Sequence, residues 1–428
     1  MQKKLYLCAL NRIIVSIYFL FIRIAALFGH RKARLMVEGQ KKTAALLDRC
    51  AVRSETAGAA GSKIIWFHAA SVGEFEQARP VIEHLTTNDK RQTTKIIVTF
   101  FSPSGYELRK NYALADKVMY LPFATRRNAK RFLNAVQPDM AIFVKYEFWP
   151  AYLRALRKRK IPTYLISGIF TPKQLFFRPW GVSYRRLLRC FTTLFVQDES
   201  SRELLSKYGF ENVVVAGDTR FDRVATVSCQ TADAVGSETA SLLDHFADSS
   251  ANVIVAGSTW PADEALLAQY IETHEDVKLI LVPHEIDEAH LHHIFQLFQG
   301  RFVRFTEATP LNIRHVRVLV VDTVGLLSKL YRYGQAAYVG GGFGVGIHNT
   351  LEPAVYGMPV LFGPNHERFR EALGLKAAGA GFAVNNYASF EAAMDDALAH
   401  HEEYGQKAKA YIDSELGATD TILNNLTI

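Results

Sequence analysis

The stretch "IIWFHAASVGEFEQARPVIEHL", Ile64 to Leu85, contains the pattern that decides the fold. An apolar run ends in small residues, and apolar residues then recur at helical spacing, which predicts a buried strand followed by a helix. Ser71 precedes this helix and Glu74 stands three positions later, as in a capping box. Ligands of α/β proteins bind at the carboxyl ends of strands. Glu74 is therefore a candidate both for starting the helix and for chemistry.

The alternation of strand and helix continues through both halves of the chain. Short runs of β-branched and aromatic residues alternate with polar segments of helical spacing, which predicts parallel sheets with helices on both faces. The expected fold class is α/β, with two doubly wound, Rossmann-like domains facing a cleft. The runs that predict strands include KIIWFHAA, KIIVTFF, DMAIFVK, IPTYLISG, TLFVQD, NVIVAGS, VKLILVPH, VRVLVVD and AAYVGGG.

The length of 428 residues also favours two domains, because one core of ordinary size does not extend over so long a chain. A polar stretch rich in alanine and serine, 226–250, predicts a linker. The predicted organisation is an apolar membrane anchor at 1–30, a first Rossmann-like domain at 31–225, the linker, and a second Rossmann-like domain with a terminal helix at 251–428.

The N-terminal segment differs most in composition from the rest of the chain. It is mostly apolar from Leu5 to Phe28, is interrupted by Arg12 and Arg23, and is followed by a basic cluster. Its length approaches the roughly 20 residues that span a bilayer, but arginines at mid-depth are costly. Positive charge after the segment predicts a cytoplasmic body. A single anchoring span and a helix lying in the membrane interface both explain the pattern, and a buried core helix is the alternative without a membrane.

The formal net charge of +8 indicates an anionic partner. Basic clusters lie in the first half, at 126–131, 154–160 and 185–189, and aromatic residues accompany the last. These clusters are either solvated helix faces or a surface that binds anionic lipid. Anionic lipid is the favoured partner over nucleic acid, because the apolar N-terminal segment would have no role in binding nucleic acid. The four cysteines form no CxxC pair, which indicates a reducing compartment.

A glycine-rich turn in the second half is the strongest candidate for binding an anion. The stretch "AAYVGGGFGVGIHNTLEPAVYGMPVLFGP" predicts a strand that ends at Gly340, a turn to Gly346, and a helix with Asn349 as its N-cap. Glycines let the main chain approach an anion, and Glu352 in the helix is suited to a ribose diol. The spacing is neither GxGxxG nor a P-loop. A turn that only packs strand against helix is the structural alternative.

Other polar residues follow predicted strands and are candidates by position. Lys145 and Glu147 follow one strand, and Asp218, Arg220 and Asp222 follow another. Each alone is also explained as a cap or a solvated loop, and their common place at strand ends is what favours a site. The histidines at 284, 290, 292 and 293 raise the question of a metal, but "HLHH" is typical of a helix surface, and we predict no metal site.

Five motifs in this order resemble the 3-deoxy-D-manno-octulosonic acid (Kdo) transferases of lipopolysaccharide synthesis. They are FHAASVGE, KYEFWP, GDTRFD, VPHEIDE and GIHNTLEPAVYGMPVLFGP, and the resemblance covers nearly the whole chain. It implies a GT-B fold anchored at the cytoplasmic side of the inner membrane, CMP-Kdo as donor, and a phosphorylated lipid A precursor as acceptor. It also implies inverting transfer without a covalent intermediate, a cofactor or a metal.

The resemblance also implies roles for residues at matching positions. The first domain would bind the acceptor, and Glu74 would be the general base that deprotonates its sugar hydroxyl. Arg220 would stabilise the growing charge of the departing CMP. The residues implied to hold CMP in the second domain are Pro283, His284, Val324, Gly325, Leu326, Asn349, Thr350, Leu351 and Glu352.

Three positions depart from the better-known enterobacterial pattern. Lys145 replaces a glutamate credited with transition-state support, Arg220 replaces a lysine, and His284 replaces an arginine. The first change reverses a charge and leaves Glu147 to take over part of that role. Another GT-B transferase or epimerase that uses a UDP-sugar, and a non-catalytic membrane adaptor that binds nucleotide, remain alternatives. A nicotinamide oxidoreductase is disfavoured because no acidic residue follows a GxGxxG turn.

Overall fold

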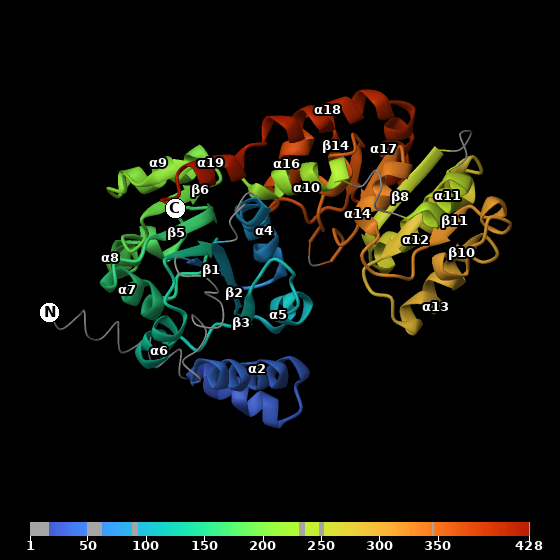
Figure 1. The fold of residues 1–428 in the computed structure, drawn as a ribbon. Coiled ribbons are helices and arrows are strands. Elements are labelled where there is room, and N and C mark those ends of the chain that lie inside the picture. Colours follow the sequence, from blue (N-terminus) through green and yellow to red (C-terminus); the bar gives the residue numbers. More distant parts are fainter. Residues whose placement is uncertain are drawn as a thin grey trace. The chain divides into compact units, whose positions relative to one another are not determined.

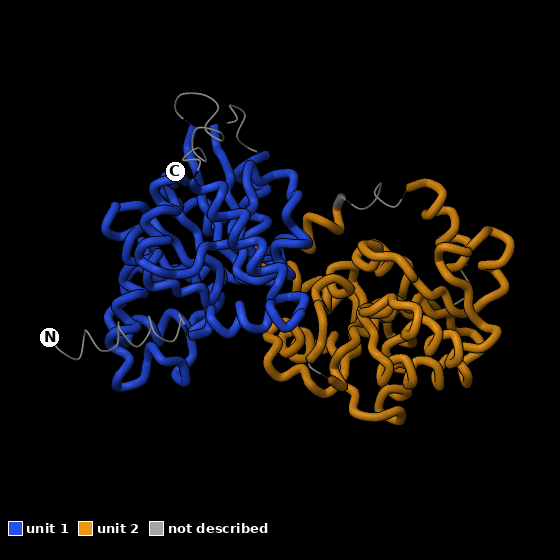
Figure 2. Tube along the Cα trace, turned by 90° about the horizontal axis from the view of Figure 1, so that it is seen from below, with its two compact units in different colours: residues 1–223, 417–428 blue, residues 224–416 orange. Residues whose placement is uncertain are grey.

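The computed structural model describes residues 17–48, 62–87, 93–230, 236–247, 252–344 and 346–427. The chain divides into two compact units, the first of residues 1–223 and 417–428, and the second of residues 224–416 (Figure 2). Each unit contains one seven-stranded sheet in which every described pair of neighbouring strands is parallel (Figure 1). The predicted α/β class with two doubly wound sheets is confirmed.

The first sheet has the strand order β3-β2-β1-β4-β5-β6-β7, so the order reverses beside β1. Such a switch point opens a crevice at the carboxyl ends of the central strands. The strands are β1 (Lys63–Ala69), β2 (Thr94–Phe100), β3 (Lys117–Tyr120), β4 (Met140–Val144), β5 (Thr163–Gly168), β6 (Thr193–Val196) and β7 (Val213–Val215).

Helices cover both faces of the first sheet, because its strands are apolar on both sides. One core cluster contains Trp66 and Phe143, and the other contains Phe67 and Ile142. The helices of this unit are α2 (Arg31–Asp48), α4 (Val72–Thr87), α5 (Pro103–Arg109), α6 (Arg126–Val136), α7 (Pro150–Lys158), α8 (Val182–Leu188), α9 (Glu199–Lys207) and α19 (Ala418–Asn424), with the 3-10 turns η1 (Leu175–Phe177) and η2 (Pro179–Gly181).

The second sheet repeats this plan with the order β10-β11-β9-β8-β12-β13-β14. Its strands are β8 (Asn252–Thr259), β9 (Val277–Pro283), β10 (Phe302–Arg304), β11 (Val318–Val320), β12 (Ala336–Val339), β13 (Val360–Phe362) and β14 (Gly381–Ala383). The sequence pattern did not predict β14, because three residues beginning with glycine carry no clear strand signal.

Helices again cover both faces of this sheet, and two further core clusters lie beneath them. These elements are α11 (Ser237–Phe246), α12 (Pro261–Thr273), α13 (Glu288–Leu297), α14 (Leu327–Leu330), α15 (Leu351–Ala354), α16 (Arg370–Ala377), α17 (Tyr387–Ala399) and α18 (His401–Ser414), with the 3-10 turns η3 (Phe305–Glu307), η4 (Ile313–His315) and η5 (Tyr331–Tyr333).

The observed units differ from the predicted boundaries at two places. The predicted linker contains α11, whose Leu243 and Phe246 are buried in the core of the second unit. The C-terminal residues 417–428 belong to the first unit rather than to the second. Asp222 of α10 (Thr219–Gln230) holds them there, because its carboxylate accepts hydrogen bonds from the main chain of Gly417 and Thr419 and from the Thr419 hydroxyl.

The N-terminal apolar segment lies partly outside the described residues, which begin at residue 17. Residues 17–27 are helical, and Phe19 packs against Phe123 just beyond β3. Within the described residues, no helix combines the length and the apolar character needed to cross a bilayer. Membrane attachment therefore stays a prediction.

Candidate functional site

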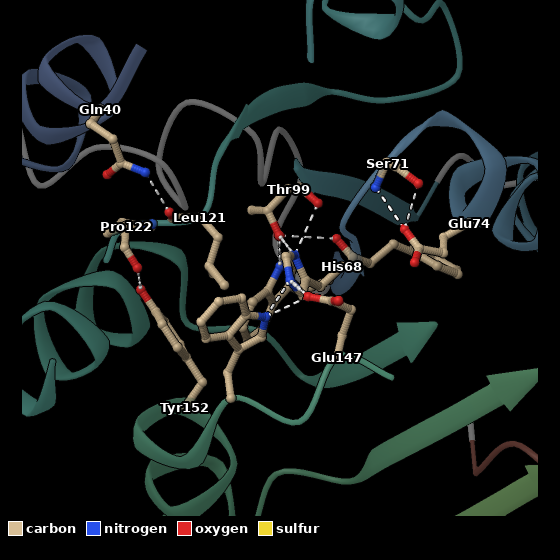
Figure 3. Close-up of polar contacts among 12 residues, drawn as sticks. Gln40, His68, Ser71, Glu74, Thr99, Leu121, Pro122, Glu147 and Tyr152 are labelled. Atoms are coloured by element: carbon tan, nitrogen blue, oxygen red, sulfur yellow. Dashed lines mark hydrogen bonds and ion pairs between the residues drawn. The ribbon is translucent and has the colours of Figure 1, made fainter. Parts of the chain in front are cut away.

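Glu74 lies in the first turn of α4, at the carboxyl end of β1. Its Oε2 accepts hydrogen bonds from both the main-chain N–H and the hydroxyl of Ser71, each at 2.7 Å (Figure 3). This confirms one half of the predicted capping box, since Ser71 directs its hydroxyl to the carboxylate and not to the main chain of Glu74. No described residue donates a hydrogen bond to Oε1 of Glu74, which is half-buried. The side chain starts the helix with one oxygen and keeps the other available.

His68 is a buried residue near the carboxyl end of β1, the strand that precedes Glu74. Its Nε2 lies 2.9 Å from Oε2 of Glu147, and its Nδ1 lies 3.1 Å from the carbonyl oxygen of Thr99 (Figure 3). The indole N–H of Trp149 donates to the same Glu147 oxygen. The network therefore joins the ends of β1, β2 and β4 and fixes the loop that follows β4. The sequence analysis assigned no role to His68.

The loop after β4 contains Lys145, a position at which this chain departs from the enterobacterial pattern. Glu147 is only 9% exposed and is engaged by His68 and Trp149, so it holds the loop in place. Lys145 has a φ of 53°, a left-handed conformation that is strained for a residue with a side chain. Such strain persists only where neighbours enforce it, and here the main-chain N–H of Lys145 donates to Ile166.

Asp218 and Arg220 form a second polar group of the first unit, at the start of α10. The guanidinium of Arg220 donates through Nε and Nη2 to Oδ2 of Asp218, at 2.9 and 2.8 Å, and Gln77 of α4 donates to Oδ1. Burial opposes ionisation of Asp218, but Arg220 and the hydrogen bond from Gln77 lower its pKa overall. The ion pair orients Arg220, whose side chain stays a quarter exposed.

The glycine turn of the second unit is held by a buried carboxylate. Asp263 of α12 accepts from the main-chain N–H groups of Gly341 and Trp260, both at 2.9 Å, and from the hydroxyl of Tyr338. Burial raises the pKa of Asp263, although these hydrogen bonds oppose the rise. Gly341 has a φ of 90°, and a Cβ at Gly342 would lie 2.5 Å from the Cα of Gly363. The turn therefore needs glycine, as predicted.

The segment after the turn corrects the predicted helix start. The N-cap is Thr350, and α15 has only four residues. Asn349 instead forms a local turn, because its Oδ1 accepts from the N–H of Leu351 at 3.1 Å. Its Nδ2 donates to Glu352 at 3.0 Å. A helix this short has a small dipole, so any anion bound here depends on the turn and not on the helix.

The structure brings His284, after β9, to the segment after β12. The ring of His284 stacks on His348 with 4.4 Å between centroids, and on Trp260 with 4.8 Å. The indole N–H of Trp260 also donates to Nε2 of His348. Burial, with a smaller contribution from His284, lowers the pKa of His348 to about 4. The result is an aromatic stack at the edge that carries the glycine turn.

The remaining predicted positions of this edge follow adjacent strands. Pro283 ends β9, and Val324, Gly325 and Leu326 follow β11, its neighbour in the sheet. Val324 is 84% exposed. The structure thus places the residues predicted to hold CMP at one sheet edge, where His284 stacks on His348 and Asn349 contacts Leu351 and Glu352.

One histidine of the "HLHH" run is not at the helix surface, contrary to the prediction. Nε2 of His290 lies 3.0 Å from both oxygens of Glu264, and both side chains are largely buried. Glu264 also accepts from the hydroxyl of Thr259. The pair ties α13 to α12. No group of three potential ligands suited to a metal occurs among the residues that the structure describes.

Comparisons with known proteins relate this chain to one family. Residues 37–223 match the sequence model of the family described as 3-deoxy-D-manno-octulosonic-acid transferase (kdotransferase). A protein of Aquifex aeolicus named 3-deoxy-D-manno-octulosonic acid transferase is 28% identical over 355 residues, which cover 81% of this chain and 89% of that protein. A protein of the same name from Rickettsia felis is 24% identical, and the match covers 83% of each chain.

The sequence similarity to Kdo transferases extends over most of the chain, and the resemblance noted in the sequence motifs is confirmed. Among solved structures, the UDP-GlcNAc 2-epimerase of Neisseria meningitidis has a TM-score of 0.58 at 18% identity, over 85% of this chain and all of that one. A putative UDP-N-acetylglucosamine 2-epimerase of Listeria monocytogenes has a TM-score of 0.56 at 14% identity, over 85% and 95%. At such identities the likeness concerns the fold alone.

Sequence reasoning missed three residues that hold the candidate site. His68 and Trp149 stand inside quoted motifs, and Asp263 stands three positions after Trp260 in "TWPADE". A capping-box pattern was the available signal for Asp263, because the residue caps Trp260 before it reaches Gly341. No local signal pairs His68 with Glu147, since 79 positions separate them.

Proposed function

We propose that this protein is a Kdo transferase, a glycosyltransferase that moves Kdo from CMP-Kdo to a phosphorylated lipid A precursor of the lipid IVA type with inversion, and that Glu74 is the general base. The observation that carries the proposal is that the two carboxylate oxygens of Glu74 have different surroundings. Ser71 holds one oxygen, while the other has no partner among the described residues. A base of this kind is fixed in direction yet able to accept a proton.

In the proposed step, the acceptor hydroxyl attacks the anomeric carbon of Kdo while its proton passes to Glu74. The bond between that carbon and the CMP phosphate oxygen breaks, and CMP leaves as a phosphate monoester. Arg220, oriented by Asp218, is the proposed cation for the growing negative charge. Lys145, which keeps a positive charge at the end of β4, is proposed to assist.

The second unit is proposed to bind the CMP part of the donor. Its glycine turn, in which Gly341 has a φ of 90°, is the main-chain segment proposed to meet the phosphate. Glu352, positioned by Asn349, is proposed for the ribose hydroxyls. The stack of Trp260, His284 and His348 offers a flat aromatic surface beside them.

We further propose that the protein acts at the cytoplasmic side of the inner membrane. Residues 17–28 expose several large apolar side chains, among them Leu27 and Phe28 at 86% and 88%. Exposed apolar surface of this size next to basic residues is typical of attachment to anionic lipid. Flotation of the full chain with vesicles containing phosphatidylglycerol checks this, and recovery of all protein at the bottom of the gradient would contradict it.

The central experiment is transfer of Kdo by a Glu74→Gln variant to a defined phosphorylated lipid acceptor. The substitution keeps the shape and removes the proton acceptor, so we expect kcat to fall by roughly 10²–10⁴. Glu76→Gln is the matched control, since Glu76 stands on the same helix and pairs with Arg79 and Arg109. Equal turnover by the Glu74 and Glu76 variants would refute the proposed base.

Competition between nucleotides separates the proposal from its alternatives. We expect CMP to displace a labelled CMP ligand from the full chain, and UDP to displace it poorly. Preference for UDP would instead indicate a transferase or epimerase of UDP-sugars. CMP binding without transfer to any lipid acceptor would indicate a nucleotide-binding adaptor.

A further inference from the structure

The first unit contains a pocket of about 640 Å³ that the proposed transfer step does not use. It lies between the helix of residues 17–27, the helix α2, and the chain that follows β3. Its volume falls in the range of pockets that enclose small ligands. Both helices belong to the same unit as Glu74, and Figure 1 shows α2 beside β3 and α6.

The wall formed by the chain after β3 is fixed by internal hydrogen bonds. The side-chain amide of Gln40 donates to the carbonyl of Leu121, and the hydroxyl of Tyr152 donates to the carbonyl of Pro122 (Figure 3). Asn128 donates to the carbonyl of Phe123 in the same way. Because these main-chain oxygens already have partners, the inner surface is left mainly to apolar side chains. That lining includes Ala26, Leu27, Val37, Ala44, Leu47 and Phe123.

The pocket also has a strongly positive rim. Arg23, Arg34, Lys41 and Arg131 line it, while Glu38 is the only acidic residue among the lining residues that the structure describes. Arg131 is engaged by Asp48 and by the carbonyl of Ala44, and Arg34 lies 3.9 Å from Glu38. Arg23 and Lys41 form no ion pair with any residue that the structure describes, and both are exposed. An apolar interior below cations is complementary to an acyl chain that carries an anionic head.

The position of the pocket relates it to Glu74. Pro122 and Phe123 directly follow β3, and Glu74 follows β1 at the same edge of the same sheet. Only β2 separates these two strands, so their ends stand about 10 Å apart at a spacing of about 4.8 Å per strand. A ligand whose chain enters the pocket can therefore reach the carboxylate with a sugar attached to that chain.

We propose that this pocket binds an acyl chain of the acceptor lipid, and that Arg23 and Lys41 bind its phosphate. The inference rests on the proposed function and adds to it the place where the acceptor is held. The exposed apolar side chains of residues 17–28 continue the pocket outward, so a lipid can pass from a membrane surface without crossing water.

The test fills the pocket and compares acylated with deacylated acceptor. Ala44 lines the pocket, and Ala45 is exposed on the same helix, so Ala44→Phe has Ala45→Phe as its matched control. Each buried methylene contributes about fourfold to affinity. We expect Ala44→Phe to raise KM for a phosphorylated, acylated glucosamine disaccharide at least tenfold, and to leave KM for the deacylated disaccharide unchanged.

A second variant keeps the test valid if Ala44→Phe does not fold. Ala26→Phe fills the pocket from the other helix and should produce the same selective rise in KM. Thermal unfolding of each variant identifies any that do not fold. The proposed binding of phosphate is tested by the double variant Arg23→Gln and Lys41→Gln, which should raise KM for phosphorylated acceptors only. The double variant Arg31→Gln and Lys42→Gln is its control.

The outcomes distinguish failure of the pocket proposal from failure of the proposed function. If all pocket variants transfer Kdo with the KM of their controls, the pocket proposal is wrong and the function stands. If the unmodified protein transfers to neither acceptor, both fall. If Ala44→Phe weakens binding of dimyristoyl phosphatidylglycerol but not of the acceptor, the pocket belongs to a membrane lipid and our assignment is overturned.

Discussion

The carboxyl edges of the two sheets are built from the same plan and present different chemistry. At the first edge the polar groups are side chains, and Glu74 keeps one oxygen available. At the second edge the carboxylate of Asp263 is fully buried and accepts from three donors, two of them main-chain N–H groups. A carboxylate can serve chemistry only where one of its oxygens can be reached, and both oxygens of Asp263 are buried and already engaged. The first edge is therefore suited to proton transfer and the second to binding.

The first prediction tests whether the buried network under Glu74 is structural. Glu147→Ala removes the carboxylate that faces Nε2 of His68 and accepts from the indole N–H of Trp149, at about 1–3 kcal/mol for each buried polar group that loses its partner. We expect the free energy of unfolding, measured by urea denaturation, to fall by about 2–5 kcal/mol. Glu107→Ala removes only an exposed pair with Lys110 and should change it little. Equal effects of the two variants would contradict the network.

The second prediction concerns the buried carboxylate of the other edge. Asp263→Asn keeps the size but replaces one acceptor oxygen with a donor, so either the Tyr338 hydroxyl loses its acceptor at Oδ1 or both main-chain N–H groups lose theirs at Oδ2. We expect the free energy of unfolding to fall by about 1–3 kcal/mol and CMP binding to weaken with it. Isothermal titration with CMP measures the second effect. The exposed Glu275→Gln is the control, and unchanged CMP affinity in the Asp263 variant would show that the turn does not bind CMP.

The third prediction separates capping from chemistry at the first edge. Ser71→Ala removes the hydroxyl that directs Glu74 and should cost about 1 kcal/mol of unfolding free energy, with a fall in kcat smaller than that of Glu74→Gln. Ser102→Ala removes the cap of α5, where the hydroxyl accepts from Ser104, and should cost a similar amount without changing kcat. A fall in kcat in both variants would mean that capping alone explains the effect.

The fourth prediction is that the free energy of unfolding depends on pH through His348 at the second edge. The pKa of His348 is about 4 in the folded protein and lies below the ordinary value of 6.5. The unfolded chain then binds more protons below pH 6.5, so the contribution of His348 to stability falls as the pH drops from 6.5 towards 4. Urea denaturation at pH 7 and pH 5 measures the loss. His348→Phe keeps a ring in the stack and should reduce the difference, and an unchanged difference would contradict the assignment.

The sequence predicted the sheets and their edges well, because both depend on local patterns. Each apolar run from KIIWFHAA to PVLFGP became a strand, and polar residues do follow those strands. The pairing of Ser71 with Glu74 was predictable because three positions separate them on one helical turn. The start of α15 was predicted one residue early, because Asn349 satisfies its local turn just before the helix begins at Leu351.

Contacts between distant segments were beyond the sequence. Glu147 belongs to a motif that suggested a catalytic role, yet it is buried against His68. Asp222 has the spacing of a helix-start residue, yet it holds the C-terminal segment 195 positions away. The acyl-chain pocket joins residues 23–47 to residues 122–131, and no spacing in the chain indicates that they meet.

By itself, the sequence determined that this protein has two doubly wound sheets, where their carboxyl edges fall, and which family its motifs resemble. These properties follow from periodicity and from short-range hydrogen bonds, which neighbouring residues determine among themselves. Only the tertiary structure decided which carboxylates are used up by the fold and which remain available. That distinction depends on how many donors distant segments bring to one buried oxygen, and burial makes each missing donor costly.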